Sequence, residues 1–254
     1  MREKRTGIIL NSRHIVILLS TITILLVMAH LVTIAMPYIF EGFEHGLVRL
    51  LFSLFFLDGE GNVPAIFSTW LFLLNAVIFL IVWKAAGRSG DSHKIWLFLS
   101  GVFVFLALDE SISIHERLID PLRQALGATG IFYYAWIIPY GVGVVLLAII
   151  AIPVFWRMQK RIRFWFGLSA ATYLVATIGL EMISGKYLVM MNEQKDIVWI
   201  FMVTVEESLE MVGLIILVYA QLLLLRDKYN GFLIYMPGTG DAVSYTHLTL
   251  PTNT

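Results

Sequence analysis

Six long apolar segments set the strongest limit on what this chain can fold into. Each is long enough to cross the hydrocarbon core of a bilayer, which takes about 20 residues. Because backbone polar groups find no partner in lipid, such segments fold as helices. With 59% hydrophobic and only 14% charged residues, a water-soluble globule is excluded. We predict an all-α, polytopic membrane helix bundle with six transmembrane helices, at residues 14–36, 65–83, 95–116, 131–156, 164–189 and 197–225.

The positive charges predict how this bundle sits in its membrane. With the N-terminus inside, 13 of the 18 Lys and Arg residues fall in inside segments and 5 in outside segments. Because basic loops stay cytoplasmic in multipass proteins, we predict cytoplasmic termini and a multipass protein of the bacterial cytoplasmic (inner) membrane, with the lipid bilayer as its solvent. Residues 46–61, GLVRLLFSLFFLDGEG, are too short to cross and predict a short amphipathic outer helix between spans one and two.

The rest of the composition and the chain ends narrow the possibilities. A net charge of zero gives no reason to expect a nucleic-acid partner, and the lack of cysteine excludes thiolate metal sites. The basic start leads into an apolar segment without a cleavage pattern, so we expect a retained first span. We expect one six-helix domain over residues 1–230 and a truncated native tail at 231–241. Residues 242–252, AVSYTHLTLPT, resemble a translated sequencing adapter, so 242–254 is expected to be a non-native artefact.

Acidic and histidine side chains recur at one depth of the predicted bundle. An ionisable group near mid-membrane costs about 2.5–3.5 kcal/mol by insertion scales, so its presence needs a reason. The topology places these groups in the outer halves of their spans: His30 in the first, Asp109, Glu110, His115 and Glu116 in the third, Glu181 in the fifth, and Glu206, Glu207 and Glu210 in the sixth. Glu60 and Asn62 precede the second span on the same side. We predict a polar cavity in the outer leaflet.

One interpretation of this cavity is a divalent-metal site, since carboxylates and imidazoles on facing helices form such centres in bundles. The candidate metal ligands are His115, Asp109, Glu116, Glu181, Glu206, Glu210 and His30. The catalytic candidates are Asp109, Glu116 and Glu207. The protein would then be a metal-dependent enzyme that acts on a lipid-like substrate.

Two other interpretations stay open. Clustered acids can load and release protons, which predicts a proton- or cation-coupled transporter of a small molecule. Alternatively, the acids lie at the interface, reach water and pair with basic side chains, as in a membrane scaffold without catalysis. The basic partners would be Arg117, Arg123 and Lys186. Aromatic residues at the start of the fourth span predict an interfacial belt, formed by Tyr133, Tyr134, Trp136 and Tyr140.

Helix geometry predicts which of these side chains meet. At 100° per residue, Asp109, Ser113 and Glu116 share one face of a continuous third span. On the sixth span, three acids lie within one arc of the helix surface: Glu206, Glu207 and Glu210. Below them, Gly213 allows a neighbouring helix to approach closely. We expect the carboxylates of Asp109 or Glu116 to lie within about 4–6 Å of those of Glu206 or Glu210, the reach of a shared ion.

Three motifs carry a resemblance to known proteins. They are LDGEGNVP at 57–64, LALDESISIHE at 106–116 and TVEESLEMVG at 204–213. Over residues 40–225 the chain resembles a group of uncharacterised bacterial multipass membrane proteins, which pair an Asp-x-Glu-x-Asn-x-Pro element with a helix ending in Asp-Glu…His-Glu. The group has no assigned reaction, so the resemblance supports the choice of site residues but does not indicate which reaction they carry out. Intramembrane hydrolases of the alkaline ceramidase type also use a metal, but through a His-x-x-x-His pair that this chain lacks.

Overall fold

A computed structural model describes residues 12–39 and 46–229 of the chain. This part is all-α, and six of its helices are long and apolar enough to cross a membrane, as predicted. The helices are α1 (Ser12–Ile39), α2 (Gly46–Phe55), α3 (Val63–Arg88), α4 (Lys94–Ile112), α5 (Ile114–Leu126), α6 (Ile137–Trp156), α7 (Lys160–Leu174), α8 (Glu181–Met190) and α9 (Ile197–Tyr229), with a 3-10 turn at Gly130–Phe132. The predictions for the first residues and for the tail at 231–254 lie outside the described residues.

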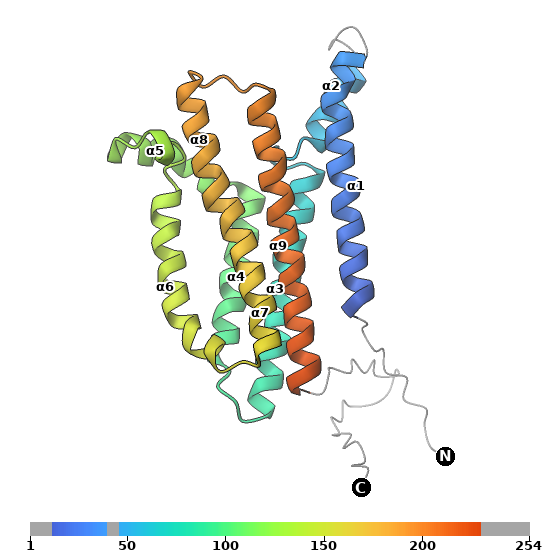
Figure 1. The fold of residues 1–254 in the computed structure, drawn as a ribbon, viewed down its shortest axis with the longest axis vertical. Helices are drawn as coiled ribbons and strands as arrows, with labels where there is room; N and C mark the ends of the chain where they lie inside the picture. Colours follow the sequence, from blue (N-terminus) through green and yellow to red (C-terminus); the bar gives the residue numbers. More distant parts are fainter. Residues whose placement is uncertain (1–11, 40–45, 230–254) are drawn as a thin grey trace.

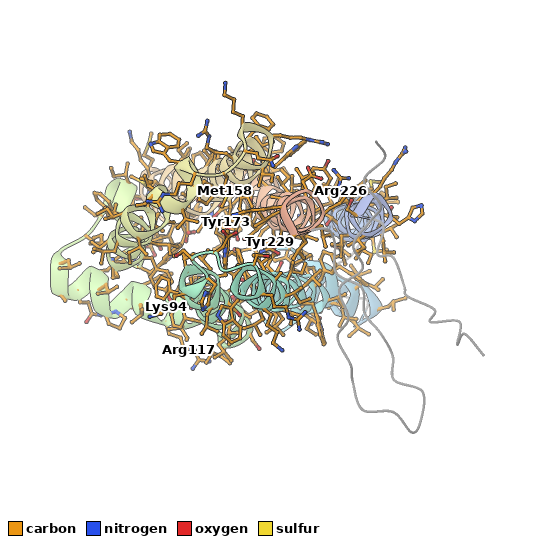
Figure 2. The ribbon with its side chains drawn as sticks, turned by 90° about the horizontal axis from the view of Figure 1, so that it is seen from below. Lys94, Arg117, Met158, Tyr173, Arg226 and Tyr229 are labelled. Carbon is orange, nitrogen blue, oxygen red and sulfur yellow. The ribbon has the colours of Figure 1, made fainter. Side chains whose placement is uncertain are left out.

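The helices form two layers around α9. Seen along the helix axes, α3 and α4 make one layer, α1, α9 and α7 make the other, and α6 lies at one edge (Figure 2). α9 packs along α1, α3 and α7, and Val82, Trp96, Ile162 and Val218 join the two layers in a buried apolar core. The predicted short helix between the first two spans is α2, which begins at Gly46. The acidic residues of the predicted site lie at the end of the bundle that carries α5, at the top of Figure 1.

Close packing between α7 and α9 depends on a glycine. A Cβ added at Gly213 would lie 3.0 Å from both the Cβ and the backbone nitrogen of Tyr173. The Ser169 hydroxyl donates to the Gly213 carbonyl over 2.8 Å, which fixes this contact. The predicted close approach at Gly213 is therefore confirmed, and it holds Tyr173 between the two layers (Figure 2).

The third span is shorter than predicted. α4 ends at Ile112, Ser113 takes a left-handed conformation with φ 54°, and the chain turns into α5. The Asp109 carboxylate accepts the backbone N–H of His115 over 2.9 Å and so caps the first turn of α5. The prediction of a continuous helix over 95–116 is wrong, and Asp109, Ser113 and Glu116 do not share a helix face. α5 instead runs across the end of the bundle (Figure 1).

The fifth span changes its helical form next to the polar residues. Residues Val175–Leu180 form a π-helical turn between α7 and α8, and the three together make one span, Lys160–Met190. A π turn holds one extra residue per turn and shifts the face on which the following side chains lie, and such turns are frequent at functional sites. Here the shift comes directly before Glu181.

The alternating direction of the six spans leads to a prediction about orientation. The chain starts α1 and ends α9 at the same end of the bundle, opposite α5 (Figure 1). We expect a reporter fused after Lys94 to be cytoplasmic and one fused after Asn192 to be periplasmic, because Lys and Arg concentrate at the first of these ends. Alkaline phosphatase and fluorescent-protein fusions would measure this, and exchanged signals would show that the α5 end faces the cytoplasm.

Candidate metal centre

An acidic cavity of about 370 Å³ opens at the α5 end of the bundle. Its walls come from the α2–α3 loop, α4, α5, α6, the fifth span and α9. Ten carboxylates line it: Asp58, Glu60, Asp109, Glu110, Glu116, Asp120, Glu181, Glu206, Glu207 and Glu210. The lining also contains His115 and two fixed cations, Arg123 and Lys195. So many acidic groups around one cavity favour the binding of a cation, which relieves their mutual repulsion.

The cavity brings together seven of the eight residues predicted for the site. His115, Asp109 and Glu116 reach it from α4 and α5, and the remaining four come from α8 and α9, namely Glu181, Glu206, Glu207 and Glu210. The gathering of these acids from separate spans agrees with the depth pattern in the sequence. The expected 4–6 Å approach between the acids of the third and sixth spans stays a prediction.

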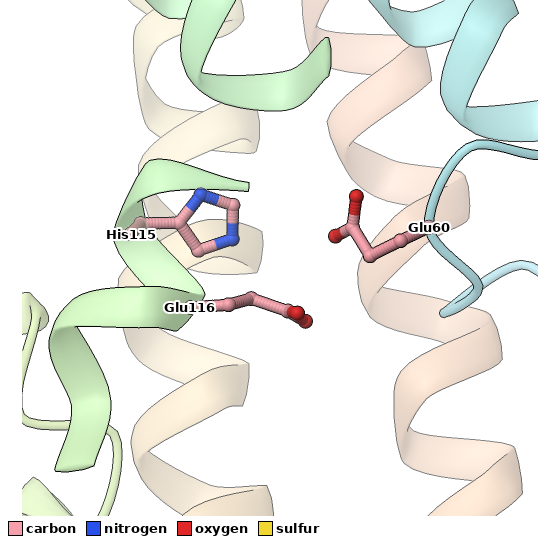
Figure 3. Close-up of side chains that lie close together, drawn as sticks. All are labelled: Glu60, His115 and Glu116. Carbon is pink, nitrogen blue, oxygen red and sulfur yellow. The ribbon is translucent and has the colours of Figure 1, made fainter. Parts of the chain in front are cut away.

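Three side chains at the mouth of the cavity lie close together and offer ligand atoms of the kind that metal ions bind. Glu60, His115 and Glu116 each offer one ligand atom, and the three atoms lie within 4.8 Å of one another (Figure 3). Ligands about 2.1 Å from one ion can be at most about 4.2 Å apart, so small side-chain movements would close the set. Glu60 and Glu116 are exposed and His115 is half-buried, which leaves the site open to the cavity.

Asp109 holds His115 in the orientation that a metal ligand needs. One Asp109 oxygen accepts the backbone N–H of His115, and the other lies 3.2 Å from its ring Nδ1. Because a carboxylate only accepts hydrogen bonds, Nδ1 carries the hydrogen and Nε2 is left for an ion. The Tyr140 hydroxyl donates to the same carboxylate over 3.0 Å. A carboxylate behind a ligating histidine is a common support of metal sites, so we assign Asp109 to positioning and not to direct ligation.

Charge and burial determine how these groups hold protons when no ion is bound. Burial lowers the pKa of His115, but the hydrogen bond to Asp109 and the surrounding carboxylates outweigh it and raise the pKa to about 9. Burial and the negative charge of Glu60 raise the pKa of Glu116. Burial also raises the pKa of Asp58 to about 7, against the pull of Lys195. An incoming ion therefore has to displace protons from this site.

The deeper acids are held by neutral donors. The Trp136 indole N–H donates to Glu181 over 2.7 Å, and the Thr177 hydroxyl donates to Glu210 over 2.7 Å. Thr177 lies in the π-helical turn, so this turn aims a donor at α9. Glu206 is buried, with 7% of its surface exposed. These contacts fix the orientation of the acidic side chains on the far wall of the cavity.

Three of the four aromatic residues predicted as an interfacial belt precede α6, and Tyr140 lies in its first turn. All four line the cavity, and Trp136 is 4% exposed. Arg123, which the interfacial interpretation would pair with the site acids, lies instead 3.3 Å from Glu193 and 3.8 Å from Asp120, over the ring of Tyr133. The turn at 130–136 thus contributes to the cavity lining, and an interfacial position for these rings stays a prediction.

His30 lies outside this cavity. Its Nδ1 accepts the backbone N–H of Leu57 over 3.2 Å, and its Nε2 lies 2.8 Å from the Thr204 hydroxyl. That hydroxyl gives its own hydrogen to the Ile200 carbonyl, so Nε2 is the donor and the imidazole is neutral with both nitrogens used. His30 anchors the loop that carries Glu60, and we leave it out of the proposed ligand set.

Sequence patterns did not assign Glu60, Asp58 or Glu110 to the site. Glu60 lies in a loop, where no helical spacing predicts its direction. The one available signal was its place in the motif DGEGNVP directly before the second span. Asn62 of that motif caps α3 by accepting the Ala65 N–H over 3.1 Å, and it donates to the Phe56 carbonyl, so the motif shapes the loop around Glu60.

A family model described as a domain of unknown function, DUF8692, matches residues 18–225. The chain belongs to this family. The DUF8692 match runs from α1 into α9 and so contains every element that lines the acidic cavity. Comparisons with curated proteins and with solved structures gave no match.

Proposed function

We propose that this multipass membrane protein binds a divalent metal ion through Glu60, His115 and Glu116 and uses it to hydrolyse a lipid-like substrate. The observation that carries the proposal is the convergence of three ligand atoms within 4.8 Å, one of them on a histidine oriented by a buried carboxylate. Two oxygen ligands and one nitrogen suit Zn²⁺, Mn²⁺ or Fe²⁺.

The residues around this ion have roles that fit hydrolysis. A site with three protein ligands keeps a position for water, whose pKa the ion lowers to about 7. Glu207 lines the same cavity from α9 and is the carboxylate that we assign to take the proton from that water. A bound ion would supply this activated water for addition to an acyl carbon of the substrate, and the leaving group would take up the proton as its bond to that carbon breaks. Asp109 keeps its positioning role.

One observation favours a second candidate, a proton- or cation-coupled transporter. The carboxylates do not stop at the three ligands but continue along the cavity to Glu206 and Glu210 on α9. A row of acids facing so few fixed cations is the arrangement that proton and cation pathways use.

Metal titration of purified, chelator-treated protein tests the first candidate against the second. We expect one Zn²⁺ or Mn²⁺ per chain, and metal-dependent loss of a component when the loaded protein is incubated with bacterial lipid extract and followed by mass spectrometry. If the protein binds no ion, and proteoliposomes instead take up cations along a pH gradient, the transporter is the correct function.

Metal affinity is expected to rise with pH. His115 holds a proton up to about pH 9, so an ion must displace that proton at neutral pH, and each unit of higher pH makes this displacement easier. Between about pH 6 and pH 8 the affinity should increase about tenfold or more per unit, because at least one proton is released. Titration calorimetry in buffers of different ionisation enthalpy measures the protons directly. An affinity that is flat over this range would show that His115 is not a ligand.

A further inference from the structure

A second cavity, of about 370 Å³, lies between α6 and the wall formed by α3, α4 and α7. Val144, Leu147, Ala151 and Phe155 of α6 recur at helical spacing and line it together. Nearly all of its other lining residues are also apolar. The exceptions are Tyr173 and Ser169, and the Ser169 hydroxyl is already bonded to the Gly213 carbonyl. We call this space the apolar chamber.

The apolar chamber adjoins the acidic cavity. Five residues line both spaces: Phe72, Leu106, Val144, Tyr173 and Leu174. The rings of Phe72 and Tyr173 meet edge to face at 6.0 Å between centroids, at the level where the lining changes from carboxylates to hydrocarbon. One elongated site therefore has a polar end near the metal ligands and an apolar end inside the bundle.

The length of the apolar chamber matches one leaflet. From Val144 to Phe155 the α6 helix rises about 16 Å at 1.5 Å per residue, which is about half of a 30 Å hydrocarbon core. The volume is at the lower end of the roughly 300–1,000 Å³ of ligand cavities, enough for one chain.

α6 separates this chamber from the bilayer. It is not among the described helix pairs that pack closely along one another, and its opposite face is open to lipid, with Leu146 56% and Ile149 62% exposed. A chain that enters past α6 leaves one hydrocarbon environment for another, so it gains little hydrophobic energy by entering. Affinity then has to come from the head group in the acidic cavity.

The charges around the acidic cavity decide which head group fits. Its two fixed cations are already engaged, Arg123 with Asp120 and Glu193, and Lys195 with Asp58 at 3.8 Å. An anionic head would meet ten carboxylates and no unengaged fixed cation in the lining. We infer that the substrate is a single-chain amphiphile with a cationic or neutral head, whose alkyl chain lies in the apolar chamber. That this amphiphile is hydrolysed depends on the proposed function, whereas its binding in the apolar chamber does not.

Photo-crosslinking of the whole protein in nanodiscs tests this inference. The probes are two alkyl chains of equal length with a diazirine at the far end, one with an amine head and one with a carboxylate head. We expect the amine probe to label the chamber face of α6, at Leu147, Ala151 and Phe155, and the carboxylate probe to label it much less. Ala151→Trp should reduce this labelling about tenfold or more, because the indole would occupy the volume in which the alkyl chain lies.

Ile149→Trp is the matched control, since it adds the same side chain on the lipid face of α6 and should leave the labelling unchanged. Labels confined to Leu146 and Ile149 in the wild-type protein, or equal labelling by both probes, would overturn the inference. Metal content is measured in the same samples. Labelling of the apolar chamber without bound metal would reject the proposed function and support the alkyl-chain site. Bound metal without chamber labelling would support the metal site and reject the alkyl-chain site.

Discussion

Replacing His115 with alanine is expected to abolish divalent-metal binding. Of the three proposed ligands it supplies the one nitrogen, and it is the one held in place by a buried carboxylate. Loss of a supporting residue alone weakens metal sites about 10–100-fold, so loss of the ligand itself should exceed about 100-fold. Thermal stability should fall much more in the presence of metal than in its absence, because an ion stabilises the state that binds it. Metal analysis and melting curves with and without Zn²⁺ measure both effects.

His93→Ala is the matched control for this substitution. His93 precedes α4 at the opposite end of the bundle, where its Nδ1 lies 3.0 Å from the Asp91 carbonyl. It should keep full metal content and the full metal-dependent stabilisation. If His115→Ala lowers the melting temperature equally with and without metal, and the metal content is unchanged, His115 is a structural residue only.

Replacing Asp109 with asparagine is expected to weaken metal binding about 10–100-fold with all three ligands in place. The carboxylate accepts three hydrogen bonds, from the His115 backbone, the His115 ring and the Tyr140 hydroxyl. An amide has one acceptor oxygen, and its NH₂ group would face a donor. His115 should then lose its fixed ring orientation and the charge that favours ligation. Competition with a chromogenic chelator measures the affinity.

Glu110→Gln separates positioning from charge. Glu110 is the next residue along α4 and lines the same cavity, so its substitution removes an acidic group of the cavity without touching the bonds to His115. We expect a much smaller effect than for Asp109→Asn. Equal effects would mean that the total charge of the cavity attracts the ion and that Asp109 has no orienting role.

Much of the fold was predictable because membrane physics leaves few choices. The apolar lengths predicted six spans, and all six are present. The glycine at 213 predicted a close helix contact, which the structure shows. These features depend on the composition of a single segment, so they can be read without knowing its neighbours.

The site was harder to predict because its geometry depends on contacts between segments. The third span looked continuous, since the residues around Ser113 interrupt no apolar pattern strongly enough to signal a turn. Its end depends on the Asp109 side chain reaching the backbone six residues ahead. Glu60 comes near His115 through a loop that a histidine of the first span anchors at Leu57. Neither contact leaves a periodic signal in the sequence.

Anomalous scattering from crystals grown with Zn²⁺ or Mn²⁺ tests the metal site most directly. We expect a single strong peak between the Glu60 carboxylate, the His115 Nε2 and the Glu116 carboxylate, about 2.0–2.2 Å from each ligand atom, with Asp109 bonded to Nδ1 behind it. A peak only among Glu181, Glu206 and Glu210, or no peak in the cavity at saturating metal, would contradict the proposed site.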